Sequence, residues 1–277
     1  MVAHLPPAVK QLLTLRNPHP FPPPSPARLQ SVLSRTFNDA KQRRAETGWL
    51  VLSTCTLLTA NSPPTVGHLY RFATRSDPDN ASTRKSLADA VKKAAIMRES
   101  ALKSTIFVGV PRVILSMTAM QEVMEQDVKD GLRKNSIREA NPDNIDQIVA
   151  RGRALWKSIY APHDVKLYNK LGALHPDFIT FIIQAYGAVL SPLPGGETIE
   201  GNLSRAMGSI VGIATLRAES RVVPQLTSHV FGLLKARYEQ EGLNEEDKWL
   251  ASDEGTEWVI RTIDSILDVV EGERAKL

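Results

Sequence analysis

The sequence predicts an all-α fold built from amphipathic helices that short loops connect. Apolar residues recur three and four positions apart along most of the chain, and the alternating pattern of half-buried strands is almost absent. The chain has 277 residues, 42% of them hydrophobic, which is enough to bury one large core or two smaller ones. We therefore expect a helical bundle in which neighbouring helices run antiparallel.

The net charge of +4 comes from the N-terminal part of the chain. Residues 1–38 contain four basic residues and no acidic residue, and the remainder is neutral, with 30 basic and 30 acidic residues. A nucleic-acid-binding protein needs a concentrated basic face. The charge distribution therefore argues against a nucleic-acid partner.

Cys55 is the only cysteine, which excludes an intramolecular disulfide, a paired-cysteine redox motif and a cysteine-based zinc site. We expect it to be a small apolar residue of a core helix. The longest uncharged run, 47–70, contains prolines and many hydroxyls, so we expect no membrane span. No His, Asp or Glu cluster has metal-ligand spacing, and we expect no cofactor.

Residues 1–26 form a proline-rich N-terminal arm with eight of the 18 prolines. This density predicts an extended or surface-bound arm without a helix. A mitochondrial presequence is an alternative, because the arm has no acid and contains Arg and Ser. The prolines argue against the amphipathic helix that such a presequence requires.

The first half of the domain contains a central pair of helices over 85–125. The polar loop 75–83 offers this pair an N-cap. Gly109 can end its first helix, and Pro111 suits the first turn of its second helix. The helices expected before the pair cover 26–44, 49–60 and a stretch that begins near Pro64. After Glu125 we expect a polar connector with some helix.

The first helix of the pair carries a charge where its pattern calls for an apolar residue. Arg98 projects into the middle of a stripe formed by Val91, Ala95 and Leu102, with Glu99 at its edge. Either Arg98 reaches the rim and pairs with a surface carboxylate, or it forms a buried pair with Glu99 that lines a cavity. The charged residues expected on other faces are Asp89, Lys92, Lys93 and Lys103. The residues expected to be buried on the second helix are Val113, Ile114, Met117, Met120, Val123 and Met124.

The second half repeats the helical pattern. The helix expected over 203–217 is apolar nearly all round, which predicts a central buried position, and its Gly208 and Gly212 leave a groove for another backbone. A weak internal repeat relates 49–72 to 207–231, since each combines a buried helix, a proline and a helix with a histidine. The other expected helices cover 144–160, 165–174, 176–190, 225–240 and 258–270.

Several segments carry a family resemblance. They are the Arg98-Glu99 pair leading to VGVPRVI, the block LSRAMGSIVGIATLRAESRVVPQLTSHVFGLLKARYEQEGLNEED, and the segments LWKSIYAPH and HPDFITFIIQAYG. Together they resemble the carboxymuconolactone decarboxylase/alkylhydroperoxidase D superfamily over about 40–270, especially its divergent fungal branch. The resemblance implies an all-α domain over 27–270, built from two degenerate helix-hairpin repeats. It also implies a homo-oligomer, such as a dimer or trimer. The expected repeats cover about 27–130 and 145–270.

Redox-active members of this superfamily carry a Cys-x-x-Cys-x-x-x-His motif. If His229 is the motif histidine, the cysteine positions fall on Val222 and Gln225, and the positions before His68 lack a thiol too. The chain is therefore not expected to be a dithiol peroxidase. Decarboxylase-type members use a histidine at this helix position for acid–base chemistry, and His229 matches it.

The resemblance thus implies a site around His229, whose pKa burial can tune. A core histidine bonded to a backbone carbonyl is the alternative. The expected site residues are His229, Glu99, Arg98, Arg112 and Tyr186. Two functions stay open: cofactor-free acid–base catalysis on a small carboxylated or acyl substrate, of lyase or decarboxylase type, and ligand binding or a structural role without turnover.

The chain ends in Ala275-Lys276-Leu277, which is similar to the Ser-Lys-Leu peroxisomal tripeptide. We expect 271–277 to form an exposed tail that the peroxisomal import receptor recognises. The predicted location is the peroxisomal matrix, with the mitochondrion as the alternative.

Overall fold

The computed structural model describes residues 4–13, 22–239 and 243–272. Within these ranges the protein is all-α, as predicted: no strand is present there beyond an isolated bridge between Arg75 and Arg84. Among the described helices, none combines the length and apolarity that crossing a membrane requires. The helices of the first half are α1 (Pro7–Leu13), α2 (Pro26–Gln42), α3 (Glu46–Thr59), α4 (Pro63–Thr74), α5 (Leu87–Val108), α6 (Val110–Val123) and α7 (Gln126–Gly131). Those of the second half are α8 (Ile145–Tyr160), α9 (Asp164–Leu174), α10 (Pro176–Ala185), the π-helix η2 (Tyr186–Leu190), α11 (Arg205–Glu219), α12 (Val223–Ala236), α13 (Glu245–Leu250) and α14 (Asp253–Gly272). Single 3-10 turns are η1 (Ala81–Thr83) and η3 (Gly196–Thr198).

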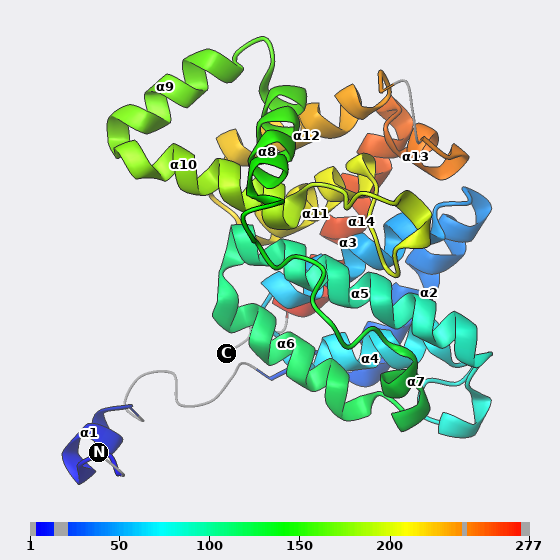
Figure 1. Ribbon diagram of the computed structural model, residues 1–277. Coiled ribbons are helices and arrows are strands. Elements are labelled where there is room, and N and C mark those ends of the chain that lie inside the picture. Colours follow the sequence, from blue (N-terminus) through cyan, green and yellow to red (C-terminus); the bar gives the residue numbers. More distant parts are fainter. Residues whose placement is uncertain (1–3, 14–21, 240–242, 273–277) are drawn as a thin grey trace.

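Helix α1 contradicts the expectation of a helix-free arm. Pro6 and Pro7 lie at its start, where a missing N–H costs no hydrogen bond, and no proline follows within the helix. The helix buries no residue, and Figure 1 shows it apart from the body. The prolines of the arm therefore do not prevent a helix over Pro7–Leu13, contrary to the prediction.

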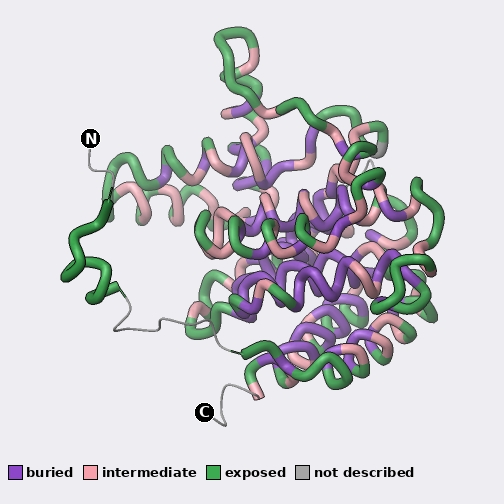
Figure 2. The backbone as a smooth tube through the Cα atoms, turned by 90° about the horizontal axis from the view of Figure 1, so that it is seen from below, coloured by how far each residue is buried: buried purple, intermediate pink, exposed green. Residues whose placement is uncertain are grey.

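Helices α3 and α11 form the centre of the body. Every residue of α3 from Gly48 onwards is buried, and so is almost all of α11. The central position predicted for the 203–217 helix is thus confirmed. The tube in Figure 2 shows the buried segments gathered in the middle, with half-buried and exposed segments around them. Helices α2, α5, α12 and α14 pack around this pair.

The turn between α5 and α6 is as predicted, and the buried face of α5 is predicted in part, since Ala94 and Ala95 are buried as expected. Gly109 has φ +78° and ends α5, and Pro111 lies in the first turn of α6. Val91 and Leu102 are only half-buried, whereas Ala90, Ala94, Met97 and Ala101 face the core. Small alanines let α5 lie close to α3 and α11, which rotates the buried face away from the larger residues.

The apolar pattern of α6 is also only partly correct. Val113 and Met120 are buried, while Ile114 is exposed, because α6 packs along one narrow face against α4 and α5. Helix α13 was not expected, since six residues are too few for a periodic pattern. It begins where Asn244 accepts a hydrogen bond from the backbone N–H of Asp247 at 2.8 Å.

A smaller core lies between α8, α9 and α10. Helix α8 touches the π-helix backbone to backbone: a Cβ at Gly187 would lie 1.8 Å from the carbonyl oxygen of Ile148, and one at Gly152 would lie 2.0 Å from that of Ile183. The helix expected over 176–190 is present, but its last turn is a π-helix. The α9–α10 hairpin projects from the body (Figure 1).

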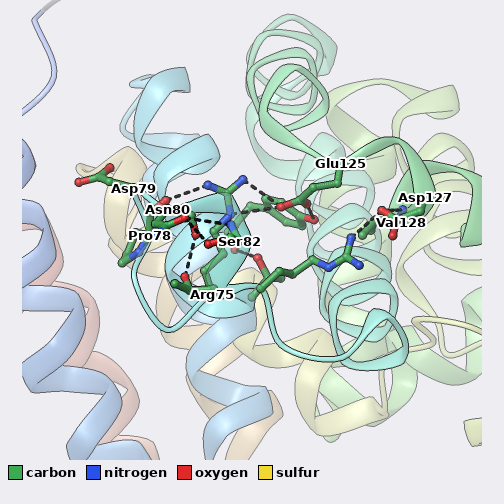
Figure 3. Close-up of polar contacts among 12 residues, drawn as sticks. Arg75, Pro78, Asp79, Asn80, Ser82, Glu125, Asp127 and Val128 are labelled. Carbon is green, nitrogen blue, oxygen red and sulfur yellow. Dashed lines mark hydrogen bonds and ion pairs between the residues drawn. The ribbon is translucent and has the colours of Figure 1, made fainter.

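The polar loop 75–83 is fixed to the junction of α6 and α7 (Figure 3). The buried guanidinium of Arg75 donates to the carboxylate of Glu125 at 2.9 and 3.2 Å and to the carbonyl of Pro78 at 2.9 Å. Arg84 binds Asp127 at 2.5 Å. These bonds hold the start of α7, and with it the segment that follows α7.

Candidate functional site

Lys103 on α5 is fully buried, whereas it was expected on an exposed face. Its Nζ donates to the carbonyls of Val189, Leu190 and Ser191 at 2.8, 2.8 and 3.0 Å. It also lies 3.4 Å from the carboxylate of Glu99, one turn earlier. The lysine is buried because the carbonyls at the end of the π-helix need donors. Burial lowers the Lys103 pKa to about 8, and Glu99 acts in the opposite direction.

Glu99 pairs with Lys103 and Arg138, not with Arg98. The Arg138 guanidinium forms a short hydrogen bond with Glu99, and its Nε donates to the carbonyl of Ala188 at 3.0 Å. The expected Arg98–Glu99 pair is therefore wrong. Glu99 neutralises two cations whose other bonds all go to backbone carbonyls, so the cluster joins α5 to the end of the π-helix.

A small cleft, called the Arg98 cleft here, lies beside this cluster. It has a volume of about 110 Å3. Its lining residues are Ala95, Arg98, Glu99, Leu102, Met117, Arg133 and Glu200. Arg98 is half-buried, and its side chain makes no hydrogen bond or ion pair with the described part of the chain. Neither expectation for Arg98 holds in full: Arg98 and Glu99 both line the cleft but do not pair, and Arg98 has no surface carboxylate as a partner among the described residues.

Arg112 does not line the Arg98 cleft. Its guanidinium donates to the carbonyl of Thr59 at 3.0 Å and to the carboxylate of Glu219 at 2.5 Å. It thereby connects the start of α6 to the ends of α3 and α11. Arg112 therefore stabilises the packing of these helix ends, and its guanidinium is already paired within the chain.

Tyr186 is buried in the first position of the π-helix. Its hydroxyl lies 3.1 Å from the hydroxyl of Tyr160, and Trp156 packs beside both rings. Burial, with a smaller effect of Tyr160, raises the Tyr186 pKa well above its usual value. A neutral, enclosed phenol of this kind stabilises the smaller core and does not serve as a base at neutral pH.

His229 on α12 is only 2% exposed. Its ring packs against Gly212 and meets the ring of Phe107 edge-on at 5.0 Å, and its Nδ1 is buried without a hydrogen-bond partner. Burial and the positive charge of Arg205 lower the His229 pKa to about 3. His229 does not line the Arg98 cleft. The expected backbone-bonded histidine is not observed either, since Nδ1 lacks any partner.

Cys55 lies in the core, as expected. The hydroxyl of Ser104 lies 3.3 Å from its Sγ, and burial raises the pKa of the thiol to about 12. A thiol of that pKa holds its proton at physiological pH and is a poor nucleophile. Within the described ranges, no three His, Cys, Asp or Glu side chains are grouped to hold a metal ion.

The five expected site residues thus fall into separate environments. Arg98 and Glu99 share the cleft, Arg112 braces helix ends, and Tyr186 and His229 are core residues. The cleft residues Arg133 and Glu200, the buried cations Lys103 and Arg205 and the half-buried Arg138 were not predicted as site residues. Arg205 donates to the hydroxyls of Ser158 and Ser209 at 2.9 and 2.5 Å inside the body. Only the position of Lys103 one turn after Glu99 was a signal in the sequence.

No protein-family model, curated protein or solved structure matches this chain.

Proposed function

We propose that the protein binds a small molecule reversibly in the Arg98 cleft and does not turn it over. The observation that carries this proposal is the half-buried Arg98, which lines a small cleft and has no hydrogen-bond or ion-pair partner in the described chain. Leu102 and Met117 supply an apolar wall beside it. A concave site with a few converging polar groups and apolar walls is typical of a ligand pocket.

Acid–base catalysis by His229 is the second candidate, and it has less support. A general base works best with a pKa near the working pH, whereas the pKa of His229 is about 3. A substrate must also reach the ring, which Gly212 and Phe107 cover. The proposal therefore favours binding without turnover over a decarboxylase-like reaction.

We also propose that the chain is a divergent relative of the superfamily it resembles. Two features support a repeated unit. Helices α3 and α11 are both buried nearly all round. Helices α4 and α12, which follow them, each have a proline in the first turn and bury a histidine, His68 and His229. The corners between them each contain non-glycine residues with positive φ, Asn61 in the first and Ser220 in the second.

Peroxisomal location remains a proposal based on Ala275-Lys276-Leu277, which lie outside the described residues.

We propose self-assembly as well, and the α9–α10 hairpin supports it. Helix α9 buries no residue, and Leu174, Phe178 and Phe181 are exposed near the corner of the hairpin. Exposed apolar patches of this kind mark interaction sites.

The proposed function can be tested by closing the cleft. The full chain would be titrated with short-chain carboxylates and their amides by calorimetry, and each ligand would be followed by NMR for consumption. Met117→Trp should abolish binding because the indole fills the cleft, while Thr118→Trp, exposed on the same helix, should not. Binding unaffected by Met117→Trp, or ligand consumption that His229→Asn prevents, would refute the proposal.

A further inference from the structure

We infer that the ligand of the Arg98 cleft is a small monoanion with a short apolar part, such as a short-chain carboxylate. Its charged oxygens would face Arg98 and Arg133, and its apolar part would lie along Leu102 and Met117. This inference rests on the proposed binding function and adds the chemical class of the ligand.

The charges around the cleft do not balance. The cations there are Arg98, Lys103, Arg133 and Arg138, and the carboxylates are Glu99 and Glu200. Glu99 is shared between Lys103 and Arg138, so it is not available to Arg98. Glu200 accepts the backbone N–H of Arg133 at 3.0 Å and makes no ion pair with Arg98. An anion would supply the missing partner, because a partly desolvated guanidinium favours a carboxylate or phosphate.

Arg133 provides the second half of the site. One of its terminal nitrogens donates to the carbonyl of Asn135, but its Nε is buried and has no hydrogen-bond partner. A buried donor without a partner is costly, and a small shift of the side chain towards a ligand oxygen would satisfy it. Two arginines on different segments, one on α5 and one after α7, therefore converge on one small space.

The shape of the cleft limits the ligand. Gly201 has φ +72°, and a Cβ there would lie 2.6 Å from the carbonyl oxygen of Ala95, so the loop before α11 lies directly on α5. This contact holds the half-buried Glu200 at the edge of the cleft, where its negative charge disfavours a dianion. The cleft volume of about 110 Å3 is well below the roughly 300–1,000 Å3 of pockets for drug-sized ligands, which suits a carboxylate with a few carbons.

The test compares three probes on the full chain: sodium butyrate, the neutral analogue butyramide and inorganic phosphate, titrated at low chloride. Butyrate should bind at millimolar concentrations or below, and both other probes should bind at least about tenfold more weakly. Arg98→Gln and Arg133→Gln should each weaken butyrate at least about tenfold. Arg153→Gln, exposed on α8, is the matched control and should change nothing. Arg98→Lys keeps the charge and should retain part of the affinity.

Butyramide binding as tightly as butyrate, butyrate affinity unchanged in Arg98→Gln, or no butyrate binding would each overturn the inference. Tighter binding of phosphate than of butyrate would contradict the inference that the ligand has an apolar part. The two proposals fail in different ways. If butyrate and butyramide bind the unmodified chain equally and Met117→Trp abolishes both, the cleft binds ligands but not by charge. If Met117→Trp leaves butyrate affinity unchanged, the binding site is elsewhere and both proposals fall. Circular dichroism and the melting temperature establish that each variant is folded.

Discussion

Gly212 and His229 fit together so closely that a side chain at one excludes the other. A Cβ added to Gly212 would lie 2.5 Å from Nδ1 and 2.7 Å from Cγ of His229, well inside van der Waals contact. The two residues come from α11 and α12, and the imidazole occupies the space that the glycine leaves. The histidine is thus a packing residue of the interface between these helices.

Gly212→Ala should destabilise the protein by about 1–3 kcal/mol, because the methyl group overpacks this interface. His229→Ala in the same chain should relieve most of that loss, since the clashing ring is gone. Urea unfolding of the two single variants and the double variant measures the coupling. Gly208→Ala on the same helix is the control: its nearest neighbour would be the Leu190 carbonyl at 3.5 Å, so it should cost nothing. Additive effects of the two substitutions would contradict this packing.

Acid should destabilise the fold through His229. Its pKa is lowered to about 3 in the folded chain against an ordinary value of 6.5, so the unfolded state binds the proton more readily between these values. Stability is therefore lost as the pH falls from 6.5 towards 3, by up to about 4 kcal/mol for this group. His229→Leu should flatten the pH dependence of the unfolding free energy in that window. His163→Gln, an exposed control, should leave it unchanged.

Lys103→Met should cost about 3–5 kcal/mol, because it leaves Glu99 with Arg138 alone and removes the donor to three carbonyls. The Lys103 pKa is lowered from 10.5 to about 8, so the folded state releases the proton first. The contribution of Lys103 to the free energy of unfolding therefore increases as the pH rises from 8 to 10.5, and it decreases again as the pH is lowered to 8. The free energy of unfolding of Lys103→Met, measured by chemical denaturation, should not show this increase. Lys92→Met on an exposed face of α5 should change stability by less than about 0.5 kcal/mol.

Self-assembly should depend on the α9–α10 hairpin. Phe181 is 61% exposed on it, and Phe181→Asp should shift the chain to the monomer in sedimentation velocity experiments by placing a charge in the apolar contact. Phe231→Asp tests specificity, because Phe231 is 55% exposed but lies on α12. Equal effects of both substitutions, or a monomeric unmodified chain at micromolar concentration, would argue against the hairpin as the interface.

Deletion of Ala275–Leu277 should make an N-terminally tagged fluorescent fusion diffuse, since the import receptor reads a free C-terminal tripeptide. The full-length fusion should colocalise with a peroxisomal marker. A substitution at Glu271, just upstream, serves as the control. If the truncated fusion still enters peroxisomes, the tripeptide is not the targeting signal.

The sequence was sufficient for the longer helices and their order, because period is a local property, but the short helices α1 and α13 were missed. The hydroxyls of Ser86 and Ser204 cap α5 and α11, so the N-cap of α5 is Ser86 and not, as was predicted, a residue of the loop 75–83. The site was harder to predict because it depends on contacts between distant segments. Glu99 pairs with Arg138, which lies 39 positions away, and Lys103 bonds carbonyls more than 80 positions away. Neither pairing therefore produces a periodic pattern in the sequence. The apolar stripe of α5 was only partly correct for a related reason: Ala94 and Ala95 are buried as predicted, but the contacts of α5 with α3 and α11 leave Val91 and Leu102 half-buried.

The seclusion of Cys55 makes the protein convenient for spectroscopy. With its sole thiol enclosed beside Ser104, a cysteine introduced at a surface position would react alone with a maleimide dye or a nitroxide. Single labels placed on α5 or on the loop before α11 would then record movements at the mouth of the cleft, with no need to remove a native cysteine first.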